Sequence, residues 1–121
     1  MITAEGEIIK GFSRNDACLV QGSLNDASGY PYEDGWNKST PPKVNFLFDK
    51  KRYLYTLRKL DKFKFIDFQL ERADLAVVIN ALELLYYENG DFEAIYSSIK
   101  KEYNVTKEDL KILIDKLKKL E

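Results

Sequence analysis

The sequence predicts an α+β fold in which a three-stranded antiparallel sheet is followed by three helices, with an N-terminal extension ahead of the sheet. Three observations predict this order. Apolar and polar residues alternate between residues 44 and 68, apolar residues recur at three- and four-residue steps after residue 72, and turn-forming residues gather between residues 22 and 42. With 121 residues, of which 45% are hydrophobic, the chain can bury one modest core.

The first 42 residues form the expected extension. The segments Glu7–Phe12 and Ala17–Leu24 flank the turn-prone residues 13–16, a pattern that favours a hairpin or one added strand. From Gly22 to Pro42 the chain is rich in Gly, Ser, Asn, Asp and Pro, which is the composition of a loop or linker. We therefore divide the chain into an extension over residues 1–42 and a main domain over residues 43–121.

Three short runs in the main domain have the alternation and the aromatic content of strands. They are Val44–Phe48, Tyr53–Lys59 and Phe63–Phe68. Tight turns between them predict an antiparallel meander. A sheet of this size is marginal in water by itself and needs a packing partner.

Three helices are expected to supply that partner. The first runs from about Arg72 to Tyr87 and stops before Gly90, the second runs from an Asp91 N-cap to Asn104, and the third is capped by Thr106. The third helix has acidic residues in its first turn, lysines near its end and a stripe of leucines and isoleucines. A three-stranded sheet with these helices is a winged-helix-like arrangement.

Composition argues against most catalytic chemistry. Cys18 is the only cysteine and histidine is absent, so zinc sites, disulfides and histidine-based proton transfer are not expected. No glycine-rich phosphate loop or nucleophile motif is present either. We expect a protein that is not an enzyme and holds no cofactor or metal. Because the chain has neither a long apolar run nor a secretory signal, we expect a cytoplasmic protein without membrane contact.

Charge is unevenly distributed along the chain. Residues 1–42 carry six acidic and three basic residues, a net charge of −3, whereas residues 43–72 carry nine basic and four acidic residues, a net charge of +5. The strand region therefore predicts a basic surface that attracts an acidic peptide or phosphates. A solvated edge rich in lysine, which prevents aggregation, explains the same pattern.

The C-terminal third carries a more specific pattern. The stretch from Asn89 to Ile95, the stretch from Ile99 to Leu110, and the leucines at 113, 117 and 120 follow one another with the spacing of a known family. The chain from residue 43 to residue 121 resembles the PqqD-like domains, which are peptide recognition elements. These domains bind the leader segment of ribosomally synthesised and post-translationally modified peptides (RiPPs).

The resemblance implies a non-catalytic protein that binds a precursor peptide and delivers it to a separate modifying enzyme, in this family often a radical enzyme. In the family the leader adds as a strand to the edge of the third strand, beside the last helix. Taken singly, the apolar members of the implied site are more typical of a core and the lysines of a solvated rim. The implied peptide-binding residues are Lys62, Phe63, Lys64, Phe65, Ile66, Asp67 and Phe68 on the edge, and Lys107, Leu110, Lys111, Ile114 and Lys118 on the groove wall.

Two other functions fit the same pattern. One is a winged-helix nucleic-acid-binding regulator, which the acidic residues on the last helix and the low pI of about 5.6 disfavour. The other is a small interaction protein of a phage or mobile element. The acidic extension adds further alternatives, since it could pair with the basic edge of its own chain, add a plain extra strand, or form the contact of a homodimer.

Overall fold

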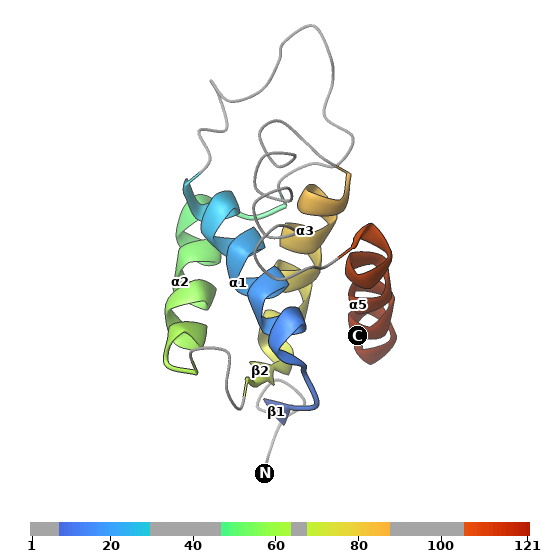
Figure 1. Ribbon diagram of the computed structural model, residues 1–121. Coiled ribbons are helices and arrows are strands. Elements are labelled where there is room, and N and C mark those ends of the chain that lie inside the picture. Colours follow the sequence, from blue (N-terminus) through green and yellow to red (C-terminus); the bar gives the residue numbers. More distant parts are fainter. Residues whose placement is uncertain (1–7, 30–46, 64–67, 88–105) are drawn as a thin grey trace, which may run out of the picture.

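The computed structural model describes residues 8–29, 47–63, 68–87 and 106–121, and these residues form a helical bundle with one very short sheet (Figure 1). The elements in chain order are β1 (Ile8–Ile9), α1 (Arg14–Gly29), α2 (Lys50–Asp61), β2 (Leu70–Glu71), the 3-10 helix η2 (Arg72–Asp74), α3 (Leu75–Tyr86) and α5 (Lys107–Leu120).

The predicted three-stranded sheet is wrong. Tyr53–Lys59, the middle strand of the expected meander, lies inside α2, and the described parts of the other two predicted strands, residues 47–48, 63 and 68, are not strands. Residues 44–46 and 64–67 lie outside the described residues. The described chain therefore contains four α-helices and a two-stranded sheet, and the winged-helix-like fold class is corrected to a helical bundle.

Helix α2 forms because its apolar residues also fit a helical period. Its buried residues lie three and four positions apart, which places them on one face of a helix. The Asp49 side chain accepts a hydrogen bond of 3.0 Å from the backbone N–H of Arg52, and basic residues in the last turn suit the negative end of the helix dipole. The buried residues are Tyr53, Thr56, Leu57 and Leu60.

The predicted N-terminal hairpin is also wrong, because α1 covers Ala17–Leu24 and extends to Gly29. The residues expected to turn instead cap this helix. Ser13 N–H donates to Asp16 Oδ2 and Asp16 N–H donates to Ser13 Oγ, each over 3.1 Å, which is a reciprocal capping arrangement. Residues 22–29 of the expected linker are helical, and residues 30–42 lie outside the described residues.

The two strands come from distant parts of the chain. β1 pairs antiparallel with β2, with Ile8 opposite Glu71 and Ile9 opposite Leu70. Gly11 then adopts a φ of +94°, a backbone conformation that suits glycine, before the chain enters α1. The N-terminal segment thus adds a strand, β1, beside residues 70–71, which come just after the edge that was predicted over residues 62–68.

The last two described helices agree with the sequence patterns. Residues 75–86 of the predicted 72–87 helix are α-helical, and η2 precedes them. Thr106 caps α5 as predicted, since its hydroxyl accepts from Asp109 N–H over 3.1 Å while the Asp109 carboxylate accepts from Thr106 N–H over 2.8 Å. The predicted helix from Asp91 to Asn104 lies outside the described residues.

Helix α3 is the centre of the bundle. Nine of its twelve residues are buried, α1 packs against both α2 and α3, and α5 packs on α3 on the side away from α2 (Figure 1).

The Tyr53 hydroxyl of α2 donates to Asn80 Oδ1 of α3, and burial raises the pKa of this hydroxyl. Asn80 Oδ1 also accepts from the backbone N–H of Leu47 over 3.3 Å. A buried polar contact therefore fixes α2 on α3.

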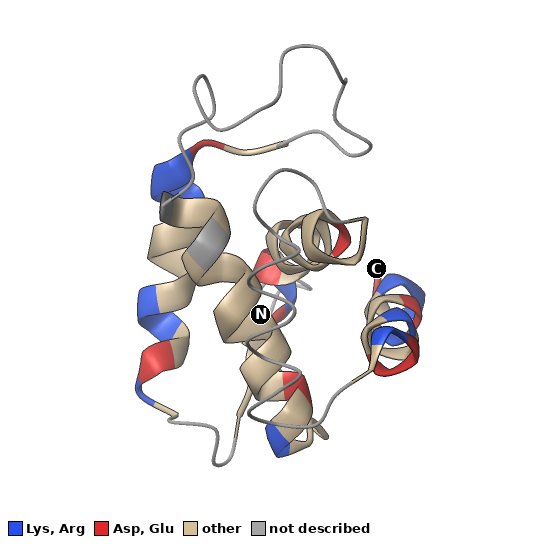
Figure 2. Cartoon of the chain, turned by 45° about the horizontal axis from the view of Figure 1, so that its top comes forward, with Lys and Arg blue, Asp and Glu red and all other residues tan. Residues whose placement is uncertain are grey.

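Basic residues lie at both ends of α2, as Figure 2 shows, with residues 50–52 in the first turn and Arg58 and Lys59 in the last. Within the ranges that the structure describes, none of the helices combines the length and the apolar character needed to cross a lipid bilayer.

Candidate functional site

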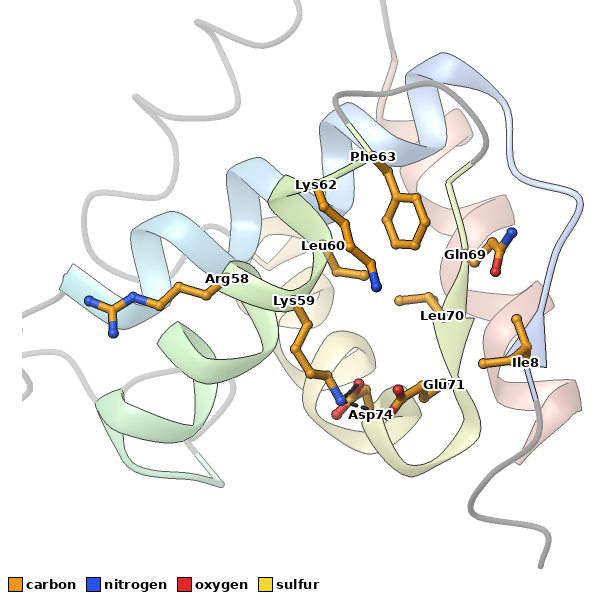
Figure 3. A pocket seen from close by; sticks show the side chains of 10 residues that line it. All are labelled: Ile8, Arg58, Lys59, Leu60, Lys62, Phe63, Gln69, Leu70, Glu71 and Asp74. Atoms are coloured by element: carbon orange, nitrogen blue, oxygen red, sulfur yellow. Dashed lines mark hydrogen bonds and ion pairs between the residues drawn. The ribbon is translucent and has the colours of Figure 1, made fainter. Parts of the chain in front are cut away.

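A pocket of about 180 Å³ lies between the C-terminal turn of α2 and strand β2 (Figure 3). The end of α2 and the turn after it form one wall, and β2 with η2 forms the other. The pocket is lined by four apolar residues, three cations, two carboxylates and one amide. In that order they are Ile8, Leu60, Phe63, Leu70, Arg58, Lys59, Lys62, Glu71, Asp74 and Gln69.

The apolar part of the pocket is firmly packed. Leu60 and Leu70 are buried, and the Phe63 ring lies edge-on to the Phe68 ring with 6.1 Å between the ring centroids. Ile8 of β1 is 45% exposed and completes the apolar surface at the rim. This surface suits an apolar side chain, because removing apolar surface from water lowers the free energy.

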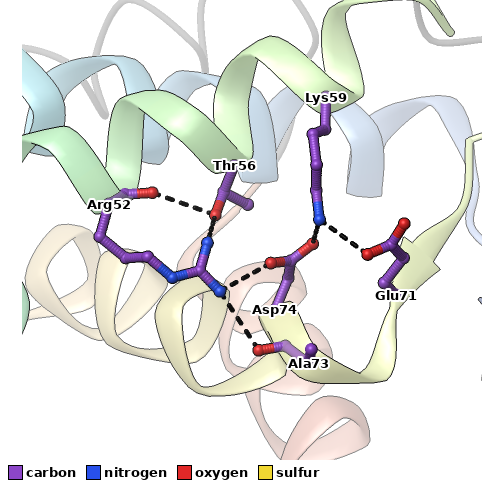
Figure 4. A network of polar contacts seen from close by, with 6 residues as sticks. All are labelled: Arg52, Thr56, Lys59, Glu71, Ala73 and Asp74. Carbon is purple, nitrogen blue, oxygen red and sulfur yellow. Dashed lines mark hydrogen bonds and ion pairs between the residues drawn. The ribbon is translucent and has the colours of Figure 1, made fainter. Parts of the chain in front are cut away.

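The charged wall is built around Asp74, whose side chain is only 1% exposed (Figure 4). Arg52 Nη2 lies 2.8 Å from Asp74 Oδ1, and Lys59 Nζ lies 2.7 Å from Asp74 Oδ2. Lys59 also pairs with Glu71 over 2.7 Å. Because both cations belong to α2 and both carboxylates to the β2–η2 segment, the network holds the two walls of the pocket at a fixed separation.

Arg52 is held by further contacts. Its guanidinium donates to Thr56 Oγ1 over 2.6 Å and to the backbone carbonyl oxygen of Ala73 over 3.3 Å. The planar guanidinium presents several donors in a fixed geometry, so it can bridge a helix and the start of the next element in this way. Arg52 therefore acts as a structural clamp.

The protonation state of Lys59 limits the role that this residue can play in the pocket. Burial lowers the pKa of this amine, but its hydrogen bonds to Asp74 and Glu71 outweigh burial and the pKa is raised above the ordinary lysine value. Lys59 is therefore protonated at neutral pH and cannot serve there as a base or a nucleophile. Its charge is suited to fixing a structure or binding an anion.

Metal chemistry has no candidate site in the described part of the chain. Among those residues, no group of three or more Asp, Glu or Cys side chains lies together in a way that could hold an ion. Cys18 is buried in α1.

The structure separates the site residues that the family resemblance implied. Lys62 and Phe63 line the pocket, and Phe68 is buried against Phe63. Residues 64–67 lie outside the described residues.

The five implied residues on the last helix do not line the pocket. Leu110 and Ile114 are buried in the core of the bundle. Lys107 and Lys111 lie over the ring of Tyr86, and Lys118 pairs with Glu83 over 3.1 Å. The groove wall expected on α5 therefore faces α3 and solvent.

Sequence reasoning missed most of the pocket. Asp74 and Leu70 looked like ordinary residues between a strand and a helix, and Ile8 is more than fifty residues away from them. One signal was present. The four-residue step from Thr56 to Leu60 and the basic residues between them fit a helix with a buried and a charged side. That pattern would have placed Lys59 and Leu60 in adjacent positions at the end of one helix.

In comparisons with known proteins, no family model, no curated protein and no solved structure matches the chain. The resemblance to the PqqD-like domains therefore stays a prediction.

Proposed function

We propose that this protein is a non-catalytic binding module that holds an extended peptide in the pocket between α2 and β2. The observation that carries the proposal is the pocket itself, in which apolar side chains and cations lie beside strand β2. Following the sequence resemblance, we propose that the peptide is the leader segment of a ribosomally synthesised precursor. The module delivers it, in the cytoplasm, to a separate modifying enzyme.

The sheet offers a place for such a peptide. Within the described residues β2 has β1 as its one strand neighbour. In Figure 3 the side chains of Lys59, Leu60 and Lys62 lie on one side of β2 and Ile8 lies on the other. A peptide strand on the α2 side of β2 gains backbone hydrogen bonds, while alternate side chains face the pocket.

The size of the pocket sets what it can accept. An apolar cavity of about 150 Å³ is large enough for a benzene ring. The 180 Å³ of this pocket therefore suits one large apolar side chain, such as leucine or phenylalanine. Removing that side chain from water stabilises a complex by about 1.5–3 kcal/mol, which corresponds to roughly ten- to hundredfold in affinity.

The charges at the pocket support the proposed binding role. Lys59 is protonated at neutral pH and is already paired with Asp74 and Glu71. The module would act by tethering, because holding the leader raises the local concentration of the rest of the peptide at the active site of another protein.

The test compares peptide binding by the original chain with binding by a variant in which a larger side chain fills the pocket. A display library of random twelve-residue peptides is selected on the full chain, and the affinities of enriched peptides are measured by fluorescence anisotropy. Ile8→Trp places a large ring at the rim of the pocket at a position that is 45% exposed, and tryptophan is well tolerated in strands. We expect at least a tenfold loss of affinity.

Ile112→Trp is the matched control, since Ile112 is 57% exposed on α5 and does not line the pocket. It should leave affinity unchanged, and far-UV circular dichroism should show that both variants are folded. A selection that enriches no peptide, or enriched peptides that bind Ile8→Trp as tightly as the original chain, would overturn the proposed function.

A further inference from the structure

Four exposed residues form a continuous stripe along α2 and its C-terminal cap, which we call the α2 stripe. They are Lys51, Tyr55, Arg58 and Lys62. Successive members lie four, three and four residues apart, so they occupy one face of the helix. This face points away from the buried residues that pack α2 on the bundle. The stripe ends at the pocket, because Arg58 and Lys62 also line it.

The three cations of the α2 stripe have no carboxylate partner among the described residues. The neighbouring cations behave differently, since Arg52 and Lys59 are both paired with the buried Asp74. The stripe therefore carries three positive charges that the described part of the chain does not compensate. Such charges attract an acidic partner.

Tyr55 gives the stripe an apolar centre. Its side chain is 59% exposed, whereas the other aromatic ring of α2, that of Tyr53, is buried. The ring is held in place by its neighbours, with the Arg52 guanidinium 5.6 Å and the Lys59 amine 5.1 Å from the ring centroid. The salt-bridge network at Asp74 thus also orients the exposed ring.

We propose that the α2 stripe selects acidic residues in the peptide that the pocket binds, an inference that rests on the proposed function. The stripe is about 16 Å long, since its ends are eleven residues apart on a helix that rises about 1.5 Å per residue. An extended peptide covers that distance with about five residues. Its alternate side chains are separated by about 6.6 Å, close to the 5.4 Å of one helical turn.

This match specifies a pattern in the peptide. One apolar side chain enters the pocket, and carboxylates at three alternate positions then meet Lys62, Arg58 and Lys51, while the Tyr55 ring packs between the last two. Figure 3 shows that the Arg58 side chain points away from the other side chains that line the pocket. A peptide anchored in the pocket can therefore continue along the helix and meet the stripe.

A peptide fits these observations better than a nucleic acid. The stripe supplies only three unpaired cations, the chain as a whole has a formal net charge of −1, and the acidic residues Asp49 and Asp61 lie at the two ends of α2. Nucleic-acid-binding domains instead carry a strong excess of positive charge. The adjoining pocket also has an apolar floor, which a phosphate backbone does not use.

The test repeats the library selection on the full chain and on the triple variant K51Q/R58Q/K62Q. We expect peptides selected on the original chain to carry one apolar residue and acidic residues at alternate positions. Peptides selected on the triple variant should keep the apolar residue and lose the acidic ones. The best acidic peptide should bind the triple variant about tenfold more weakly, because three exposed ion pairs are lost. Its affinity for the original chain should also fall as salt is raised.

The control variant K10Q/R14Q/K119Q removes three exposed cations that are not on α2, and it should keep the acidic preference. Enrichment without an acidic preference, or a preference that survives in the triple variant, would overturn the role of the α2 stripe and leave the proposed function standing if Ile8→Trp still weakens binding. A labelled single-stranded oligonucleotide that binds the original chain more tightly than the best peptide would also overturn it. A selection that enriches nothing would overturn both.

Discussion

Replacing Asp74 with alanine should destabilise the fold, because it removes a buried carboxylate that pairs with two cations of α2. The carboxylate is 1% exposed and lies 2.8 Å from Arg52 and 2.7 Å from Lys59. Removing one partner of a buried ion pair typically costs about 3–5 kcal/mol because the other charge remains buried.

The cost should lie below that range here. The side chains of Arg52 and Lys59 are 30% and 27% exposed, so water reaches both, and each keeps another partner in Thr56 or Glu71. We expect a loss of about 2–3 kcal/mol in the free energy of unfolding. For a domain of this size that corresponds to a fall of roughly 6–15 °C in Tm.

Urea unfolding followed by far-UV circular dichroism measures this loss. Asp74→Asn should be intermediate, since the amide oxygen can still accept from Arg52 without a negative charge. Glu71→Ala removes the other partner of Lys59, but the Glu71 side chain is 47% exposed, and we expect less than about 1 kcal/mol. If Asp74→Ala costs no more than Glu71→Ala, then Asp74 does not hold α2 against η2, and the reasoning on the walls of the pocket is refuted.

Thr106→Ala should destabilise the protein by about 1 kcal/mol in thermal unfolding, because it removes the hydroxyl that caps α5, whereas Thr106→Ser should be nearly neutral. Gly11→Ala should cost about 1 kcal/mol through the positive φ alone, since an added Cβ would meet no atom within 4 Å, and Gly11→Asn should cost less because asparagine tolerates that conformation. The raised pKa of Lys59 makes its stabilising contribution complete below the ordinary lysine pKa of about 10.4 and removes it as pH rises through the folded-state value. The difference in unfolding free energy between the original chain and Lys59→Met should therefore be constant from pH 7 to about pH 9 and shrink above pH 10, and an unchanged difference at high pH would contradict this.

The helices were predictable where capping and apolar spacing agreed. In α5, Thr106, the acidic first turn and the leucine stripe all indicate the same element, and the structure confirms it. In α2 the apolar residues fit the alternation of a strand as well as the spacing of a helix. Tyr53, Tyr55 and Leu57 alternate as in a strand and have aromatic or branched side chains, yet the residues that become buried are Tyr53, Leu57 and others at helical steps. Propensity for strands is weak and depends on the surroundings, so the burial of one helical face decided the outcome.

The local pattern was also ambiguous for the N-terminal helix α1. Ser13 and Asp16 are as typical of a turn as of a helix cap, and the residues after them are small or branched. What makes α1 a helix is the core it helps to form, in which Ala17, Val20 and Leu24 are all fully buried against the bundle. A short helix without such packing is marginal in water.

The candidate site depended still more on the tertiary structure. The excess of positive charge over residues 43–72 was evident in the sequence and predicted a surface for an acidic partner. Its place on a helix, next to a pocket, was not evident, because the alternation in that segment indicated a sheet edge. The residues at the two walls of the pocket come together only when Ile8 pairs with Glu71 and Asp74 pairs with the cations of α2.

The sequence by itself determined the composition, the absence of histidine, the uneven charge, and the capped and amphipathic helix at the C-terminus. These are local properties, set by residues within one or two helical turns of each other. The tertiary structure decided that residues 50–61 form a helix, that the N-terminal segment supplies both a core helix and a strand, and that a pocket opens beside that strand. The physical reason is that burial of apolar surface is shared among residues far apart in the chain, so it can outweigh the local preference of any one segment.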